Sequence, residues 1–477
     1  MADVEPRYSF DPLDRRGVLL GLQPVHLVTL AVAGLVAIGA ARLGGHGGPV
    51  LAVAAFVAVA ALGMWPRRGR PISAWLAEVV PWLVRRARGP SLYDGPLEGT
   101  GTRHGIRSPR GQRVSAAGPG GVDLIELESL DETTAIGALV DRRSGSWSAV
   151  MRVTGRPLSL LDPHDQARAL DGWRVTLNST GRPGTAVRRL QWVQRSRPED
   201  PALPSRLEPG DDARLSNPAV SYAQLLKSTA PAQLHESWLV VAVSGPASLG
   251  STAARRAEQT LRRELRLLEG QLRSADLGPS APLSRDEISV LVRSAHDPCG
   301  PPPAVPCARA WAVAEEESWS WLRVDASWHA TYWIADWPRV DVRPDFLAPL
   351  LLCEGNRTVS VVMSPVPPDR ALREVRSART ADAADEQLRS RAGFMPSARR
   401  NREAEGVARR EEELADGHAE YRFSGYVTVH GPDCEGLKAA CAEVEHAAQA
   451  SHVDLRRLFG RQREAFTWTL PLARGLR

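Results

Sequence analysis

Two short runs of the sequence bring together side chains that could do chemistry. They are Asp162, His164 and Asp165 in DPHD, and His296, Asp297 and Cys299 in HDPC. Imidazole, carboxylate and thiol groups at such spacing can coordinate a metal ion or transfer protons. DPHD, however, has the pattern of a helix N-terminus, and HDPC has the pattern of a turn that ends a helix. We expect both runs to be structural, and we nominate no catalytic, cofactor-binding or metal-binding residue.

The motifs of common enzyme classes do not occur in the sequence. Lys227 and Lys438 are the only lysines and neither follows a glycine, so there is no GxxxxGK[ST] loop to hold nucleotide phosphates. The patterns HExxH, GxSxG and GxGxxG are also missing. We therefore expect a protein that is not an enzyme and has no cofactor. A membrane-tethered enzyme acting on lipids or nucleotides through the DPHD run is the alternative from a different class.

Composition excludes several other classes. The five cysteines form no CxxC pair, so neither a zinc site nor a disulfide framework is indicated. The net charge of +5 is spread over 477 residues without a concentrated basic stripe, and we expect no direct nucleic-acid binding. A tryptophan-rich stretch could stack bases or sugars if it were exposed, but alternation along a strand favours packing. Its members are Trp311, Trp319, Trp321, Trp328, Trp333 and Trp337.

Two uncharged stretches near the N-terminus predict a hairpin of transmembrane helices. They run from Val25 to Ala41 and from Val50 to Trp65, each a little shorter than the roughly 20 residues that span a bilayer core. Arginines flank the pair on both outer sides, which places both termini in the cytoplasm. A cleaved signal peptide and a buried core hairpin are the alternatives.

An amphipathic helix and a linker are expected after this hairpin. Pro71–Arg88 places Trp75 and Trp82 on one side, which fits either a helix at the membrane interface or a helix docked on the soluble domain. The stretch 89–121 is rich in Gly, Pro, Ser and Arg, and it predicts a flexible linker.

The remaining sequence predicts a cytoplasmic α+β region of repeated β-α-β units with long helices over an antiparallel sheet. Hairpin strands flank a turn at 142–145, and Ser284 with Glu287 forms a capping-box pattern. Dense Arg, Glu and Ala from Asp369 to Gly417 predict a long helical hairpin, which is either a solvated surface or a partner-binding arm. The expected domains are 1–88 (membrane hairpin and interfacial helix), 89–121 (linker), 122–300 (first subdomain) and 301–477 (second subdomain).

Several motifs carry a resemblance to known families. The opening YSFDPLDRRGVLLGLQ and the run WPRRGRPISAW resemble the PrgI-type inner-membrane subunit of conjugative type IV secretion. The remainder looks like the non-motor N-terminal region of the conjugation ATPase, whose end has a phenylalanine before a Leu-Pro-Leu run, as at Phe466 and 470–472. Further runs resemble an uncharacterised actinobacterial membrane-protein family. They are DRRSGSWSAVMRVTG, LLDPHDQ, RLQWVQR, WHATYWIADWPR, SGYVTV and AFTWTLPLARGLR.

The resemblance implies a non-enzymatic structural subunit of a type IV secretion or conjugation-like apparatus. Such a subunit lies in the inner (plasma) membrane as a multi-pass protein and presents its cytoplasmic domain to a separate P-loop motor ATPase. Membrane lipid and other inner-membrane channel subunits are its other expected partners, and homo-oligomerisation stays open. An EccE-like membrane component of type VII secretion is the alternative within the same class, because it also pairs an N-terminal membrane hairpin with a cytosolic domain.

Overall fold

The computed structural model describes most of the chain, with gaps. The described residues are 8, 10, 24–43, 48–64, 66–67, 70–87, 121–127, 135–156, 158–198, 233–300, 310–312, 314–391 and 398–476. The predicted linker lies outside them except for Gly121.

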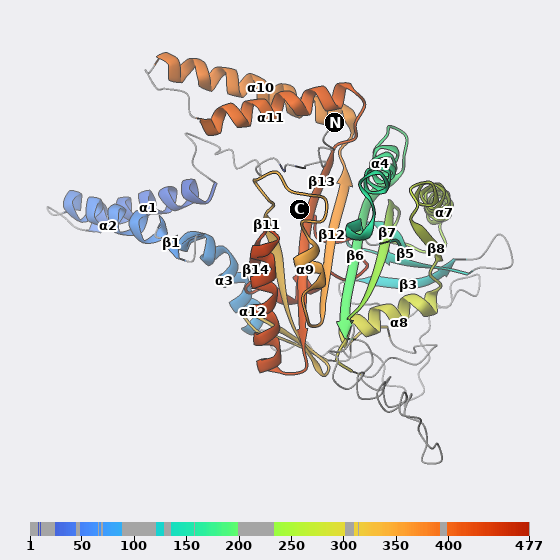
Figure 1. The fold of residues 1–477 in the computed structure, drawn as a ribbon. Helices are drawn as coiled ribbons and strands as arrows, with labels where there is room; N and C mark the ends of the chain where they lie inside the picture. The colour runs from blue at the N-terminus through green and yellow to red at the C-terminus, as the bar shows by residue number, and fades with distance from the viewer. Residues whose placement is uncertain are drawn as a thin grey trace, which may run out of the picture.

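Most strands of the described chain join one large sheet (Figure 1). The strands of its first half are β3 (Val122–Leu127), β4 (Ile136–Asp141), β5 (Ser146–Thr154), β6 (Val187–Pro198), β7 (Gln233–Ser244) and β8 (Gly278–Pro282). Those of its second half are β9 (Glu315–Glu317), β10 (Leu322–Val324), β11 (Ser327–Asp336), β12 (Arg357–Pro365), β13 (Tyr421–Gly431) and β14 (Asp454–Arg457).

The helices are distributed along the whole chain. They are α1 (Pro24–Leu43), α2 (Gly48–Met64), α3 (Ile72–Ala87), α4 (Pro163–Thr180), α7 (Thr252–Ser274), α8 (Arg285–His296), α9 (Ala348–Leu352), α10 (Pro368–Arg391), α11 (Ala398–Ala415), α12 (Cys434–Ala450) and α13 (Gln462–Phe466). A short 3-10 turn, η2, covers Leu158–Leu160.

The sheet is antiparallel throughout its recorded pairings. Its strand order is β3-β4-β5-β7-β6-β12-β13-β11-β10-β9, with β8 beside β5 and β14 beside β11. The β4–β5 hairpin turns at 142–145, as the sequence predicts. Strands β6 and β12 pair with Arg357 opposite Ser196, so strands of both expected subdomains lie in one sheet.

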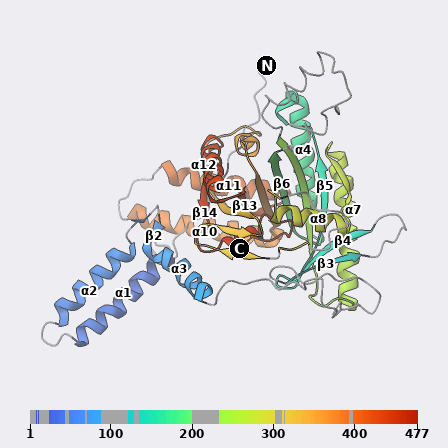
Figure 2. The same cartoon turned by 90° about the horizontal axis from the view of Figure 1, so that it is seen from below.

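Amphipathic helices cover one face of this sheet. A stripe of α7 that includes Leu261, Leu265, Leu268 and Leu272 is buried on the strand residues of the first half, as its 3.6-residue spacing predicts. In the second half α12 buries its apolar side on β11, β12 and β13. Figure 2 shows α4 and α7 beside the first half and α12 beside the second.

Helix α8 and the C-terminal segment cover the opposite face. The capping box of α8 is present, with Ser284 and Glu287 each hydrogen-bonded to the other's backbone N–H, which confirms the sequence expectation. Ile288 and Val292 of α8 pack in one cluster with Phe466 and Leu470 of the C-terminal segment. The sheet is therefore a middle layer.

The charged stretch between 369 and 417 forms the predicted helical hairpin, α10 and α11. Ala371 and Val375 are buried at its base, and Arg379 of α10 forms an ion pair with Glu411 of α11. Figure 1 shows the hairpin extending away from the sheet at the top of the view.

The predicted transmembrane hairpin is wrong in this structure. Helices α1 and α2 do form an antiparallel pair, but no helix within the described residues is long and apolar enough to cross a membrane. Helix α2 has 17 residues, about 25 Å at 1.5 Å per residue, against a hydrocarbon core of about 30 Å. Helix α1 has 20 residues, but Arg42 lies in its last turn and shortens the uncharged stretch. The multi-pass topology is not supported either.

Helix α3 docks on the sheet domain, which is one of its two expected placements. The ring of Trp75 lies 5.6 Å from that of Phe459, and the ring of Trp82 lies 5.1 Å from that of Trp319, measured between centroids. The short pair β1 (Pro66–Arg67) and β2 (Arg70–Pro71) connects α2 to α3. The N-terminal helices are therefore attached to the sheet through tryptophan contacts.

Candidate functional site

The DPHD run forms the N-terminus of α4. The Asp162 side chain accepts a hydrogen bond from the backbone N–H of Asp165 at 2.8 Å, and Pro163 is the first helical residue. The Asp165 carboxylate forms an ion pair with Arg168 at 3.0 Å, while His164 is exposed. The predicted helix N-terminus is confirmed, and both carboxylates of the run have partners within α4.

The side chains of the HDPC run face three different partners. His296 ends α8 and its Nδ1 donates to the Val292 carbonyl at 2.8 Å. Ser327 donates to Asp297 at 2.5 Å, and Asn356 donates to Cys299 at 3.7 Å. Among the described residues no group of three or more His, Cys, Asp or Glu side chains could hold a metal ion. The run ends a helix, as expected.

Two further buried histidines lie beside His296, and the sequence analysis missed them. His329 of β11 and His430 of β13 are neighbours across the sheet, with 2.6 Å between their Nδ1 atoms. His329 Nε2 lies 3.1 Å from the His296 carbonyl, and His430 Nε2 lies 3.1 Å from the Thr358 hydroxyl. The only sequence pattern that could have indicated them is the alternation of side chains along each strand, which places His329 and His430 on the same face of the sheet.

If the imidazoles are neutral, these contacts determine which ring nitrogen of His329 and of His430 donates a hydrogen bond and which accepts one. Because a carbonyl only accepts, His329 donates from Nε2 to His296 and must then accept at Nδ1. His430 therefore donates from Nδ1, and its Nε2 accepts the Thr358 hydroxyl proton. The result is a chain of three hydrogen bonds from β12 through β13 and β11 to the end of α8. We call His296, His329 and His430 the histidine cluster.

Burial keeps the histidine cluster neutral. It lowers the pKa of His296 to about 4 and that of His430 to about 3. The pKa of His329 lies well below 6.5 because of burial and the two neighbouring histidines. The nearest aromatic rings are Trp311 and Phe466, so an added charge would find little solvation. The cluster therefore suits packing rather than proton transfer near neutral pH.

A polar layer continues from the histidine cluster beneath the C-terminal segment. The Gln191 side chain donates to the carbonyls of Trp468 and Leu470 at 3.1 and 2.9 Å, and accepts from the Ala473 N–H at 2.7 Å. Ser360 also donates to the Trp468 carbonyl, at 3.0 Å. These hydrogen bonds fix the AFTWTLPLAR run on the sheet, so the run serves the architecture.

The tryptophan-rich stretch is engaged in packing. Trp311 is buried, the rings of Trp321 and Trp328 are 4.3 Å apart, and Trp333 donates from its ring nitrogen to Ser424 at 3.0 Å. Such contacts leave no row of parallel exposed rings on which bases could stack. The packing alternative is the better description of these residues.

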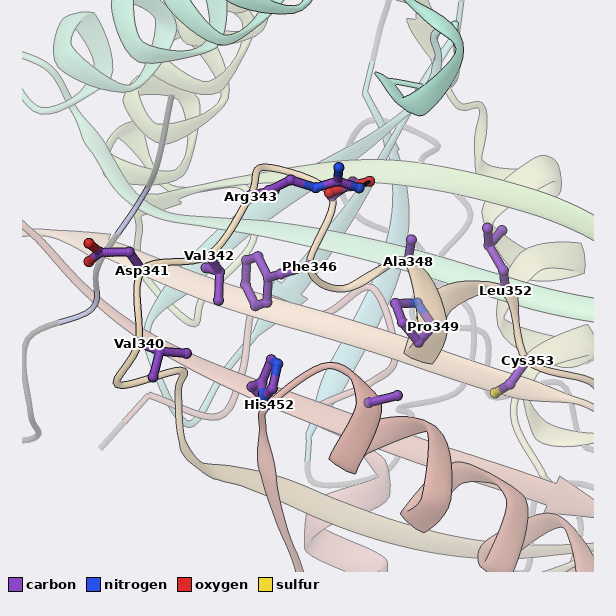
Figure 3. Close-up of a pocket in the computed structure, with 12 residues that line it drawn as sticks. Val340, Asp341, Val342, Arg343, Phe346, Ala348, Pro349, Leu352, Cys353 and His452 are labelled. Carbon is purple, nitrogen blue, oxygen red and sulfur yellow. Dashed lines mark hydrogen bonds and ion pairs between the residues drawn. The ribbon is translucent and has the colours of Figure 1, made fainter. Parts of the chain in front are cut away.

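An open cavity of about 700 Å³ lies between the segment 340–353 and the end of α12. Val342, Phe346 and Cys353 line it on one side, and His452 lies on the facing turn (Figure 3). Its ionic side chains are already paired in part, since Arg343 donates to Asp345 at 3.1 Å. Burial raises the pKa of the Cys353 thiol, which disfavours the reactive thiolate. An open, mostly apolar hollow of this kind fits a polypeptide contact better than an enclosed substrate.

One comparison with known proteins gives a match. Residues 231–334 match the family model described as "Putative type VII ESX secretion system translocon, EccE". The matched stretch runs from β7 through α7, β8, α8, β9 and β10 into β11, and it covers a minority of the chain. A search of curated proteins finds no match. The finding favours a secretion-system component and the type VII alternative, while the type IV and PrgI expectation has no support.

Proposed function

We propose that this protein is a non-enzymatic subunit of a type VII secretion translocon, of the EccE kind. The observation that carries the proposal is the family match over residues 231–334. This stretch supplies β7, an inner strand between β5 and β6, and one covering helix on each face, α7 and α8. The likeness therefore lies in the structural framework of the sheet domain.

The partners follow from this role. We propose that the chain associates at the membrane with other translocon components and with a separate ATPase that supplies the energy of transport. The open cavity and the two projecting helical hairpins support a docking role, because they present surface that another polypeptide can contact. A structural subunit of this kind acts by positioning its neighbours.

The test is a deletion of the gene in its native cell, followed by measurement of proteins exported by the type VII system. We expect export to stop and to return when the full chain is supplied. A matched pair of variants controls for folding: Leu265→Asp disrupts the buried face of α7 and should not restore export, whereas the exposed Arg256→Asp should restore it. Unchanged export in the deletion strain would contradict the proposal.

A further inference from the structure

A short segment before α1 contacts a part of the sheet domain that lies far from it in the sequence. Tyr8 forms an isolated antiparallel bridge with Val342, in which each backbone N–H donates to the other's carbonyl at 2.9 Å. The side chain of Val342 is buried, so this backbone is well anchored on the domain side. The contact has the form of strand addition, in which an extended peptide pairs with an exposed backbone edge.

Two residues further on, Phe10 enters a group of aromatic rings. Its ring stacks on Trp337 with centroids 5.4 Å apart and planes 28° apart, and meets Phe346 edge-on at 5.4 Å. Phe423 lies 6.4 Å away on a third side. We call Trp337, Phe346 and Phe423 the aromatic cage. Aromatic pairs of this geometry attract each other beyond the effect of the area that they bury.

The three rings of the cage also contact one another on the domain side. Trp337 also contacts Phe423 at 5.2 Å and Phe346 at 6.4 Å, so the three rings support one another. Gly425 of β13 makes room for this arrangement, because a Cβ there would lie 2.9 Å from the Trp337 ring. A backbone edge beside a group of aromatic rings is what peptide-binding sites use to select an extended chain with a large side chain at a fixed position.

We propose that the aromatic cage and the Val342 edge form a peptide-binding site whose ligand is this chain's own Tyr8–Phe10 segment. Residues 11–23 join this segment to α1, and a chain of that length can reach about 45 Å. Because the segment is tethered, it is present at an effective concentration in the millimolar range, which favours binding within one chain. The proposal goes beyond a translocon role and does not depend on it.

The site gives the α1–α2 hairpin a second point of attachment. Its C-terminal attachment is α3, which contacts Trp319 and Phe459 beside the N-terminal half of β11. The aromatic cage lies just past the C-terminal end of β11, at Trp337. The two attachments lie toward opposite ends of one strand, and the one at the cage limits how far the start of α1 can move from it. Release of the Tyr8–Phe10 segment leaves α3 as the remaining attachment.

A disulfide between the bridged residues tests the assignment in the full chain. In Tyr8→Cys/Val342→Cys, the Cα atoms of a hydrogen-bonded antiparallel pair are about 5.5 Å apart, within disulfide range. We expect oxidation to give an internally crosslinked monomer, identified by peptide mapping, while each single variant stays uncrosslinked. A crosslinked dimer would overturn binding within one chain, and the absence of a crosslink would overturn the docked segment altogether.

A peptide competition tests whether the cage is a binding site in its own right. The probe is a fluorescent peptide of residues 5–14, EPRYSFDPLD, added to full-length protein. We expect at least tenfold tighter binding to Phe10→Ala, whose own segment is weakened, than to the unaltered chain. The same peptide carrying Phe10→Ala, or a Phe10→Ala/Trp337→Ala protein, should show no binding. Equal affinity for the unaltered and Phe10→Ala proteins would overturn the proposal.

Discussion

The two faces of the sheet are closed in different ways. On one face, α7 and α12 bury leucine, valine and alanine against the strands. On the other, apolar packing by α8 is combined with a polar layer made by the histidine cluster, Gln191 and Ser360 beneath the C-terminal segment. On the first face the apolar side chains have only to be complementary in shape. On the second face each buried hydrogen-bond donor must also have an acceptor, because a buried polar group without a partner costs about 1–3 kcal/mol.

This difference predicts which face of the sheet is sensitive to pH and which is sensitive to the size of its buried side chains. The polar face should respond to protonation and to loss of single hydrogen bonds. The helical face should respond mainly to removal of apolar atoms. Four changes, in order of decreasing expected effect, separate the two.

Acid should have the largest effect, and it should act through the polar face. A histidine whose pKa falls from about 6.5 unfolded to about 4 or 3 folded stabilises the fold above pH 6.5 and loses that contribution as the pH decreases. At pH 5 the loss is about 2 kcal/mol for each of His296 and His430. Denaturant unfolding followed by tryptophan fluorescence between pH 7.5 and 5 measures it. His430→Gln should flatten the pH dependence, whereas Leu265→Ala, which keeps all the histidines, should not.

Leu265→Ala should destabilise the helical face by about 3 kcal/mol, since a buried leucine truncated to alanine leaves a cavity. The loss should be the same at pH 7.5 and pH 5, because no titrating group is involved. The exposed Leu267→Ala on the same helix is the matched control and should cost far less. A pH-dependent loss for Leu265→Ala would contradict the separation of the two faces.

Gln191→Ala should cost about 2 kcal/mol, because the Ala473 N–H and the carbonyls of Trp468 and Leu470 lose a buried partner. The C-terminal segment should loosen first. Hydrogen exchange at residues 465–473 provides the measurement, with exchange in α7 as an internal reference. Equal acceleration in both places would indicate global destabilisation instead of a loosened segment.

Ser284→Ala should have the smallest effect, about 1 kcal/mol, through loss of the α8 cap. Ser284→Asp keeps a capping acceptor and should restore most of the stability. Thermal unfolding distinguishes the two variants. A stability for Ser284→Ala equal to that of the unaltered chain would show that the α8 cap adds nothing to its packing.

Several helices could be predicted from the sequence, whereas most contacts of the polar layer could not. The leucine spacing of α7, the capping box of α8 and the α10–α11 hairpin are local patterns, and each predicted its element. The pairing of His329 with His430, and of Gln191 with Trp468, joins residues about 100 and 280 positions apart. No local pattern encodes such contacts. The resemblance-based type IV expectation relied on short motifs, and its Tyr8, Phe10 and Phe466 have packing roles here.

The N-terminal hairpin shows where composition misleads. Its uncharged stretches fit a spanning pair by residue type, but the helices that form are too short or carry a charged residue in the last turn. Helix length depends on where the backbone leaves the helical conformation, and α1 ends at Leu43, directly after Arg42. An apolar stretch in the sequence therefore predicts that an apolar helix forms, but it does not predict where that helix ends.

The most direct test of the central claim is affinity purification of the tagged full chain from its native cell after solubilisation in mild detergent, followed by mass spectrometry. A translocon role predicts enrichment of other type VII secretion components, including the system's ATPase, and their loss with the Leu265→Asp variant. Enrichment of conjugation or type IV secretion proteins, or recovery of the chain without any secretion component, would contradict it.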